Sequence, residues 1–106
     1  MNLKDERSDD AVNIAPDLHT VIYEDDKMRV LKVTVPQGAT AEMHWHPHNI
    51  NYILAGGTLQ FTKPEGNVVS VDLDKGQVTS AATGSSHAVK NTGNTTVETI
   101  QVELKY

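Results

Sequence analysis

The sequence predicts an all-β domain, either a sandwich or a small barrel, and three observations support this fold class. Apolar and polar residues alternate at period two along most of the chain, and no long stretch repeats at 3.6 residues. The alternating runs are short. Turn-forming residues separate them at regular intervals, as at Pro36–Gly38 and Asn91–Asn94.

Each strand-like segment is bounded by such turns. The first carries Val21 and Tyr23 on one face, and the last carries Ile100, Val102 and Leu104 in step. In chain order the expected strands cover residues 19–24, 28–35, 43–54, 58–62, 68–73, 77–81, 87–90 and 96–105. Residues 1–15 are polar and lack periodicity, so we expect a loose N-terminal arm there and a single domain over residues 16–106.

Composition excludes several classes of protein. The chain of 106 residues contains no cysteine, so disulfides and Cys-ligated metal sites are ruled out. Its longest apolar run, Tyr52–Ala55, is far shorter than the ~20 residues of a membrane span. The net charge is −5 and no basic run is present, which argues against a nucleic-acid partner. The charged N-terminus lacks the apolar stretch of a signal peptide, and we expect a soluble, cytoplasmic protein.

Three histidines at alternate positions are the main chemical feature. His44, His46 and His48 lie within EMHWHPHNIN, and the chain has only five histidines. Residues i and i+2 of a strand face the same side about 6.5–7 Å apart, so two imidazoles can lean toward one metal ion. Trp45 would then point to the opposite face.

A metal site needs a further ligand from elsewhere in the fold. His87, which follows a glycine turn in TGSSHAVKN, suits that role, whereas the lone His19 is expected at the surface. From spacing alone, surface or satisfied core histidines remain an alternative to metal ligands.

Two longer motifs resemble those of the cupin superfamily of small β-barrels. In the first, Gly38 is followed by five residues and then His44-Trp45-His46. In the second, the spacing runs from Gly76 through Gly84 and His87 to Asn91. The similarity extends from about residue 16 to the end. It implies a double-stranded β-helix, or jelly roll, in which His44, His46 and His87 hold a divalent metal such as Fe, Mn, Zn or Ni.

The sequence departs from the cupin pattern at two places. Ala82 stands where the second motif has proline, and Ile50 stands where the first motif has a metal-binding glutamate. Neither His48 nor the neighbouring asparagines can be chosen as a substitute ligand from the sequence. Without a carboxylate, three neutral imidazoles leave the metal its full positive charge, which favours an anionic ligand.

Four residues near the histidines are candidate substrate contacts. His48 could lie at a rim beyond the bend at Pro47, Ile50 could form a dry wall, Tyr52 could donate a hydrogen bond, and Gln60 could line a partly polar interior. Simpler interpretations are a core position for Tyr52 and an exposed one for Gln60. Glu98 and Glu103 are expected to face solvent.

The resemblance implies a small-molecule substrate and pairing into a homodimer. The leading hypothesis is a three-histidine, metal-dependent dioxygenase acting on a small organic acid or dicarbonyl-like compound. A metal-dependent isomerase or lyase is the second enzymatic hypothesis, and a non-catalytic module that binds or senses a small molecule is the third.

Overall fold

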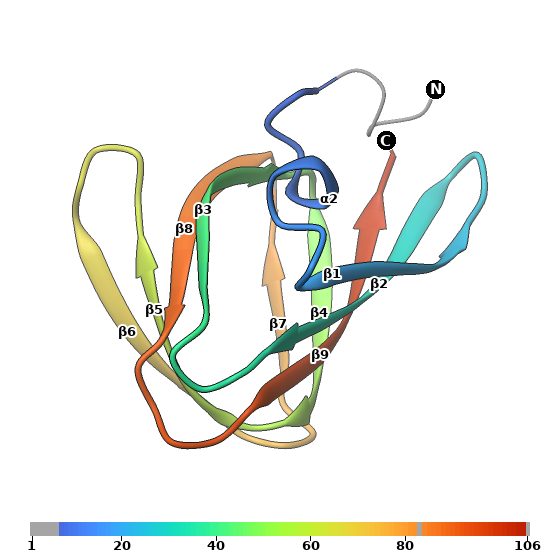
Figure 1. Ribbon diagram of the computed structural model, residues 1–106. Coiled ribbons are helices and arrows are strands. Elements are labelled where there is room, and N and C mark those ends of the chain that lie inside the picture. The colour runs from blue at the N-terminus through green and yellow to red at the C-terminus, as the bar shows by residue number, and fades with distance from the viewer. Residues whose placement is uncertain (1–6, 83, 106) are drawn as a thin grey trace.

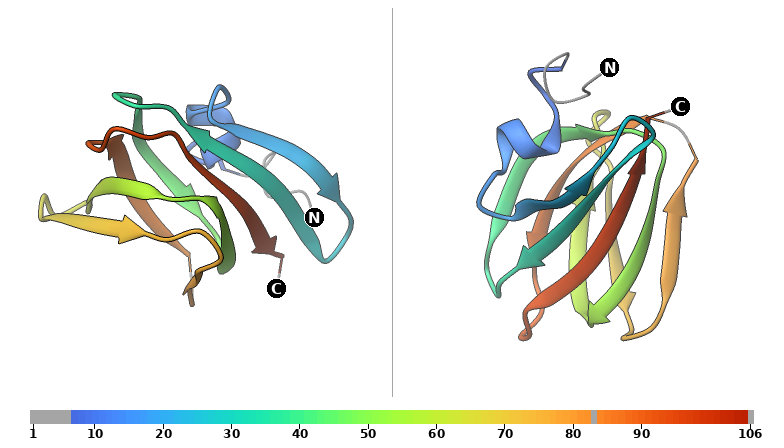
Figure 2. Two further views of the ribbon diagram at one scale, coloured as in Figure 1. Left: turned by 90° about the horizontal axis from the view of Figure 1, so that it is seen from below. Right: turned by 90° about the vertical axis from the view of Figure 1, so that its right-hand side faces the viewer.

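A computed structural model describes residues 7–82 and 84–105. Within these ranges nine strands form two antiparallel sheets that face one another (Figures 1 and 2). The strands are β1 His19–Glu24, β2 Met28–Val35, β3 Thr40–His46, β4 Asn49–Ala55, β5 Gly57–Thr62, β6 Val68–Leu73, β7 Val78–Ala81, β8 Ser85–Asn91 and β9 Val97–Leu104.

The larger sheet has the order β1-β2-β9-β4-β7 and the smaller one the order β3-β8-β5-β6. In both sheets the β-branched and aromatic side chains pack on the pleated surface, as the period-two pattern of the sequence predicts. Buried apolar side chains from both sheets form one core, which comprises Ala15, Val35, Ala41, Ile53, Leu59, Leu73, Val89 and Val97. The predicted all-β jelly-roll fold is therefore confirmed.

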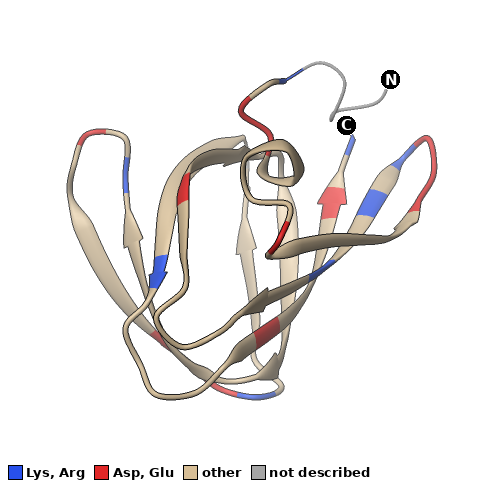
Figure 3. Ribbon diagram, viewed as in Figure 1, with Lys and Arg blue, Asp and Glu red and all other residues tan. Residues whose placement is uncertain are grey.

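The inner face of the large sheet changes along its length from charged and polar residues to mostly apolar ones. Register places Arg29, Glu103 and Asn49 in one row across β2, β9 and β4, and Leu31, Gln101 and Asn51 in the next. The third row, Val33, Thr99 and Ile53, is mostly apolar. Figure 3 shows a basic position of β2 and an acidic position of β9 on neighbouring ribbons toward the upper end of this sheet, with further charged positions lower on both strands. The barrel thus has an ionic end and an apolar end.

The described part of the N-terminal segment packs on the ionic end. Asp10 is fully buried, and its carboxylate caps the short helix α2 (Ala11–Ile14) by accepting a hydrogen bond from the Val12 N–H. The Trp45 N–H donates to the Asp9 carbonyl at 2.7 Å, so this segment adds to the edge of β3. Over residues 7–15 the expected loose arm is an ordered cover of the barrel.

The predicted strand 43–54 is two strands. Pro47 and His48 form the connection between β3 and β4, and the His48 carbonyl accepts a hydrogen bond from Leu104 N–H at 2.9 Å. Among the described residues, no helix has the length and apolar character needed to cross a membrane.

Candidate metal centre and adjoining cavity

Three predicted ligands converge on the inner face of the small sheet. His44 and His46 lie on β3, and register pairs His44 with His87 on β8. A β-bulge between Ala41 and His44 allows both of these residues to face inward. The ring centroids are 4.9 Å apart for His44 and His46, 4.9 Å for His44 and His87, and 5.2 Å for His46 and His87.

His19 joins this group, which corrects the expectation that it lies at the surface. It is 6% exposed, and its ring centroid lies 5.3 Å from that of His44 and 5.4 Å from that of His46. Ligand nitrogens of His19, His44 and His46 lie within 4.8 Å of one another. No motif marks His19. The available signal was its place at the start of a predicted strand, which the fold brings next to β3.

Hydrogen bonds fix the orientation of three imidazoles. Nδ1 donates to the Ala15 carbonyl at 3.0 Å in His19, to the Glu42 carbonyl at 2.6 Å in His44, and to the Glu103 carboxylate at 2.8 Å in His46. Each acceptor oxygen requires a proton on Nδ1, which leaves the Nε2 lone pair free. Nε2 of His44 is buried and has no hydrogen-bond partner among the described residues.

These donor atoms fit a divalent metal. Histidine ligands characteristically bind through one ring nitrogen while the other donates to a carbonyl or carboxylate, and three of the four rings have that arrangement. An unpartnered buried nitrogen is costly unless a ligand uses it. The fit therefore rests on the chemistry of the rings and not on their spacing alone.

Burial keeps the imidazoles neutral. It lowers the pKa of His46 to about 3, that of His87 to about 3 and that of His19 to about 4. Burial also lowers the pKa of His44, against the opposing effect of the Glu42 carbonyl. At neutral pH all four rings are in the form that coordinates metals.

Three buried charged residues, Asp10, Arg29 and Glu103, form an ionic chain that contacts Nδ1 of His46. The Arg29 guanidinium donates to Glu103 through Nε at 2.8 Å and also through Nη2, which donates to Asp10 at 2.9 and 3.1 Å. Asp10, Arg29 and Glu103 are all fully buried. The prediction that Glu103 faces solvent is wrong, because β9 turns Gln101 and Glu103 inward and leaves Ile100 and Val102 on the outer face. Glu98 is half-buried.

The charge of Glu103 is set by its partners. Burial raises the pKa of the Glu103 carboxyl, and the nearby charge and hydrogen bonds of Arg29 oppose that rise. Arg29 remains cationic and donates twice to Glu103, which favours the ionised carboxylate. Glu103 therefore presents a carboxylate to Nδ1 of His46 and increases the basicity of that ring.

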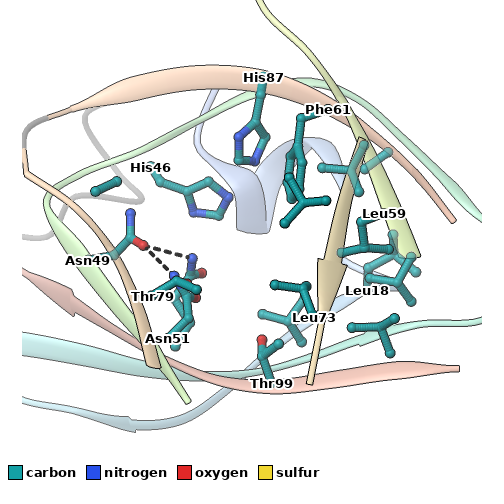
Figure 4. Close-up of a pocket in the computed structure, with 18 of the residues that line it drawn as sticks. Leu18, His46, Asn49, Asn51, Leu59, Phe61, Leu73, Thr79, His87 and Thr99 are labelled. Atoms are coloured by element: carbon teal, nitrogen blue, oxygen red, sulfur yellow. Dashed lines mark hydrogen bonds between the residues drawn. The ribbon is translucent and has the colours of Figure 1, made fainter. Parts of the chain in front are cut away.

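The imidazoles open on a cavity of about 440 Å³ between the sheets. Figure 4 shows the two kinds of wall: histidines and side-chain amides on one side, and Phe61, Leu59 and Leu18 on the other. Lys63 lines the cavity, and no carboxylate does so among the described residues. The interior therefore suits a molecule with an anionic end and an apolar body.

The four residues predicted to contact substrate lie outside this lining. Ile50 and Tyr52 are 40% and 48% exposed on the outer face of β4, His48 is in the β3–β4 connection, and Gln60 points away from the neighbouring cavity residues of β5. Even-numbered residues face inward before the connection at Pro47–His48, and odd-numbered residues face inward after it. Asn49, Asn51 and Ile53 consequently line the cavity.

The same parity determines the direction of residue 50, where the first motif has glutamate and this sequence has isoleucine. Ile50 faces outward, so no carboxylate from this position reaches the histidines. The adjacent Asn49 is buried, but its amide nitrogen donates to the Pro47 carbonyl at 2.8 Å. His19 is the additional nitrogen donor beside His44 and His46.

Trp45 anchors β3 on the side away from the cavity. The Arg7 guanidinium lies 4.0 Å from the centre of its ring. A Cβ added at Gly84 would meet the indole at 2.8 Å, so glycine at this place in the second motif permits close packing of β8 on Trp45.

Fold and site together define a cupin. The profile of the cupin domain family matches residues 31–103, and the chain belongs to that family. A comparison with curated proteins finds no match.

Solved structures of cupins are similar to this chain. A cupin domain from Bordetella pertussis is 25% identical with a TM-score of 0.76, and the match covers 83% of this chain and 92% of that one. A predicted oxalate decarboxylase from Thermotoga maritima is 26% identical with a TM-score of 0.60, covering 81% and 77%. A double-stranded β-helix protein from Klebsiella pneumoniae, 19% identical over 81% and 74% with a TM-score of 0.66, shares the fold.

Proposed function

We propose that the protein is a divalent-metal-dependent enzyme acting on a small organic acid or dicarbonyl-like compound, with oxygen-dependent cleavage as the leading reaction. The observation that carries this proposal is the set of neutral, inward-facing imidazoles at the wall of a cavity whose described lining contains no carboxylate. The proposed ligands are His44 and His46 with His87, whose ring centroid lies 4.9 and 5.2 Å from theirs. His19 is a further candidate, because its ligand nitrogen lies within 4.8 Å of those of His44 and His46. Fe, Mn, Zn and Ni all accept imidazole ligands.

The bound metal would supply positive charge for an anionic substrate and, in the case of iron, access to oxygen chemistry. The protein groups perform the other tasks. Glu103 orients His46 through Nδ1, and Lys63 offers a positive charge at the cavity. The apolar wall around Phe61 excludes water and holds the substrate body.

A lyase reaction is the second candidate, because one similar structure is that of a predicted oxalate decarboxylase. Oxalate has no apolar portion, whereas most of this cavity is lined by aliphatic and aromatic side chains. The lining therefore favours a larger acid than oxalate. A non-catalytic binding role would use the same metal and the same cavity.

Metal analysis followed by anaerobic loading with Fe(II) tests the proposal. Oxygen uptake is then measured with small acids, diketones and thiols. We expect turnover in the wild type, loss of metal and activity in His87→Ala, and neither loss in His48→Ala, the matched histidine outside the cavity. Tight ligand binding without turnover would support the binding role, and full stability and ligand binding without metal would contradict both.

A further inference from the structure

A cluster of three side-chain amides lies on the large sheet beside the histidines. Asn49 and Asn51 come from β4 and Gln101 from β9, where register pairs Gln101 with Asn51. All three line the cavity, and Asn49 and Gln101 are 4% and 6% exposed. Amides buried this deeply in a cavity wall need hydrogen-bond partners.

The orientation of the cluster follows from one backbone contact. The Asn49 amide nitrogen donates to the Pro47 carbonyl at 2.8 Å, which turns Asn49 Oδ1 toward its neighbours. That oxygen accepts from Asn51 Nδ2 at 2.8 Å and from Gln101 Nε2 at 3.4 Å (Figure 4). One N–H of each of these two amides is therefore used within the cluster, and the amide oxygens of Asn51 and Gln101 are directed away from Asn49 Oδ1.

These two oxygens are free acceptors. Gln101 Oε1 is buried and has no partner in the described parts of the chain, and Asn51 Oδ1 accepts no hydrogen bond there either. Reversing the Gln101 amide would bring two acceptor oxygens together at Asn49 Oδ1, so the assigned orientation is the favourable one. Gln101 thus places a buried acceptor without a donor at the cavity wall, beside the amide of Asn51.

We infer that Asn51 and Gln101 form a subsite for a hydroxyl or N–H group of the substrate. The inference rests on the proposed function and narrows its substrate class to organic acids that carry such a donor. The carboxylate is held at the metal-bearing histidines and Lys63, because these supply the positive charge at the cavity. The donor bonds the amide oxygens, and the carbon skeleton packs on the wall of Phe61 and Leu59.

Binding of matched acids to the zinc-loaded protein tests this assignment without catalysis. The probes are pentanoate and its 2-, 3- and 4-hydroxy derivatives, with dissociation constants from isothermal titration calorimetry. An acid whose hydroxyl meets a buried acceptor should bind about tenfold or more tightly than the deoxy acid, because the acceptor stays unpaired when the deoxy acid is bound. At least one hydroxy acid is expected to show this preference.

Two variants assign the preference to the amides. Gln101→Met removes the acceptor at similar size and should reduce the preference to about twofold or less while leaving pentanoate affinity unchanged. Thr99→Val, a change to another cavity residue of β9, should leave the preference intact. Gln101→Met removes the unpartnered Oε1 together with one long hydrogen bond to Asn49, at 3.4 Å, so its melting temperature should stay close to that of the wild type and show that the variant is folded.

Different results overturn different statements. If pentanoate binds but no hydroxy acid binds more tightly, or if Gln101→Met keeps the preference, the subsite assignment is wrong and acid binding stands. If zinc or all four acids fail to bind, the proposed function fails and this inference fails with it.

Discussion

Glu103 is the residue through which the metal centre is joined to the charged end of the barrel. Its carboxylate accepts hydrogen bonds from Nδ1 of His46 and from Arg29. A carboxylate behind a ligand imidazole typically changes metal affinity by about 10–100-fold. The sequence does not reveal this role of Glu103, because a glutamate in an alternating C-terminal strand is normally interpreted as a solvent-facing charge.

Replacement of Glu103 by glutamine keeps its shape and removes its charge. We expect zinc affinity to fall about 10–100-fold, measured by competition with a chromogenic chelator. Glu98→Gln on the same strand is the control and should bind zinc like the wild type. Equal affinity in Glu103→Gln would show that His46 gains nothing from the carboxylate.

The buried histidines make stability of the metal-free protein depend on pH. Unfolded imidazoles titrate near 6.5, whereas burial lowers the pKa of His46 and His87 to about 3 and of His19 to about 4. Below pH 6.5 the unfolded chain binds more protons than the folded one, so stability present at pH 7 is lost as the pH falls toward 4. Each histidine contributes about 1.4 kcal/mol per pH unit in that range.

Urea unfolding in EDTA between pH 7.5 and 4.5 measures this loss. The midpoint should fall steadily below pH 6.5. Glu103 acts in the opposite direction because burial raises its pKa, but it is one group against four. A midpoint that stays constant from pH 7 to 5 would show that the imidazoles are not desolvated as described.

At the scale of elements, the N-terminal segment completes the ionic chain. Asp10 holds Arg29 from one side while Glu103 holds it from the other, and all three side chains are inaccessible to solvent. Residues 7–15 show no periodicity from which this role could be predicted. Asp9 and Asp10 are identical in type and adjacent, and only the fold distinguishes the exposed carboxylate from the buried one.

Asp10→Asn tests this role, because asparagine can still cap α2 but leaves Arg29 with one anionic partner. Breaking a buried ion pair from one side costs on the order of 3 kcal/mol, and we expect a corresponding fall in the free energy of unfolding. Asp9→Asn, which alters the exposed pair with Arg7, should have little effect. Equal destabilisation by the two variants would contradict the distinction.

The connection between β3 and β4 shows where sequence periodicity loses its value. Alternation predicted that His44 and His46 face inward, because residues i and i+2 share a face within one strand. His87 lies on another strand and was predicted from the second motif. Continuing that count through Pro47 placed Ile50 and Tyr52 inside. Two residues outside either strand reverse the parity, and nothing in residues 43–54 marks the reversal except the proline.

For the whole molecule, the all-β fold was predictable because turn residues and period-two runs recur along the chain. The polar interior of the large sheet was not. Arg29, Gln101 and Glu103 face inward while Val30, Ile100 and Val102 face outward, against the ordinary preference for buried apolar residues. The inward polar groups belong to the metal centre and its support, and the outward apolar ones call for a different explanation.

The outer face of the large sheet carries a group of exposed apolar side chains. Register places Val78, Tyr52 and Ile100 side by side on β7, β4 and β9, with Ile50 and Val102 in the adjoining row. Val78 is 60% exposed and Tyr52 48%. A continuous apolar sheet face of this kind is unusual for a monomer, and the resemblance to small cupins implies pairing.

We therefore expect a homodimer that buries this face, and light scattering coupled to size exclusion measures it. Tyr52→Lys places a charge at the centre of the face and should give a monomer. Its far-ultraviolet circular dichroism and zinc affinity should match the wild type, because the Tyr52 side chain lies on the opposite side of β4 from the cavity. Val68→Lys, at an equally exposed valine on the small sheet, should leave the dimer intact. A monomeric wild type, or a Tyr52→Lys dimer, would show that the apolar face serves another purpose.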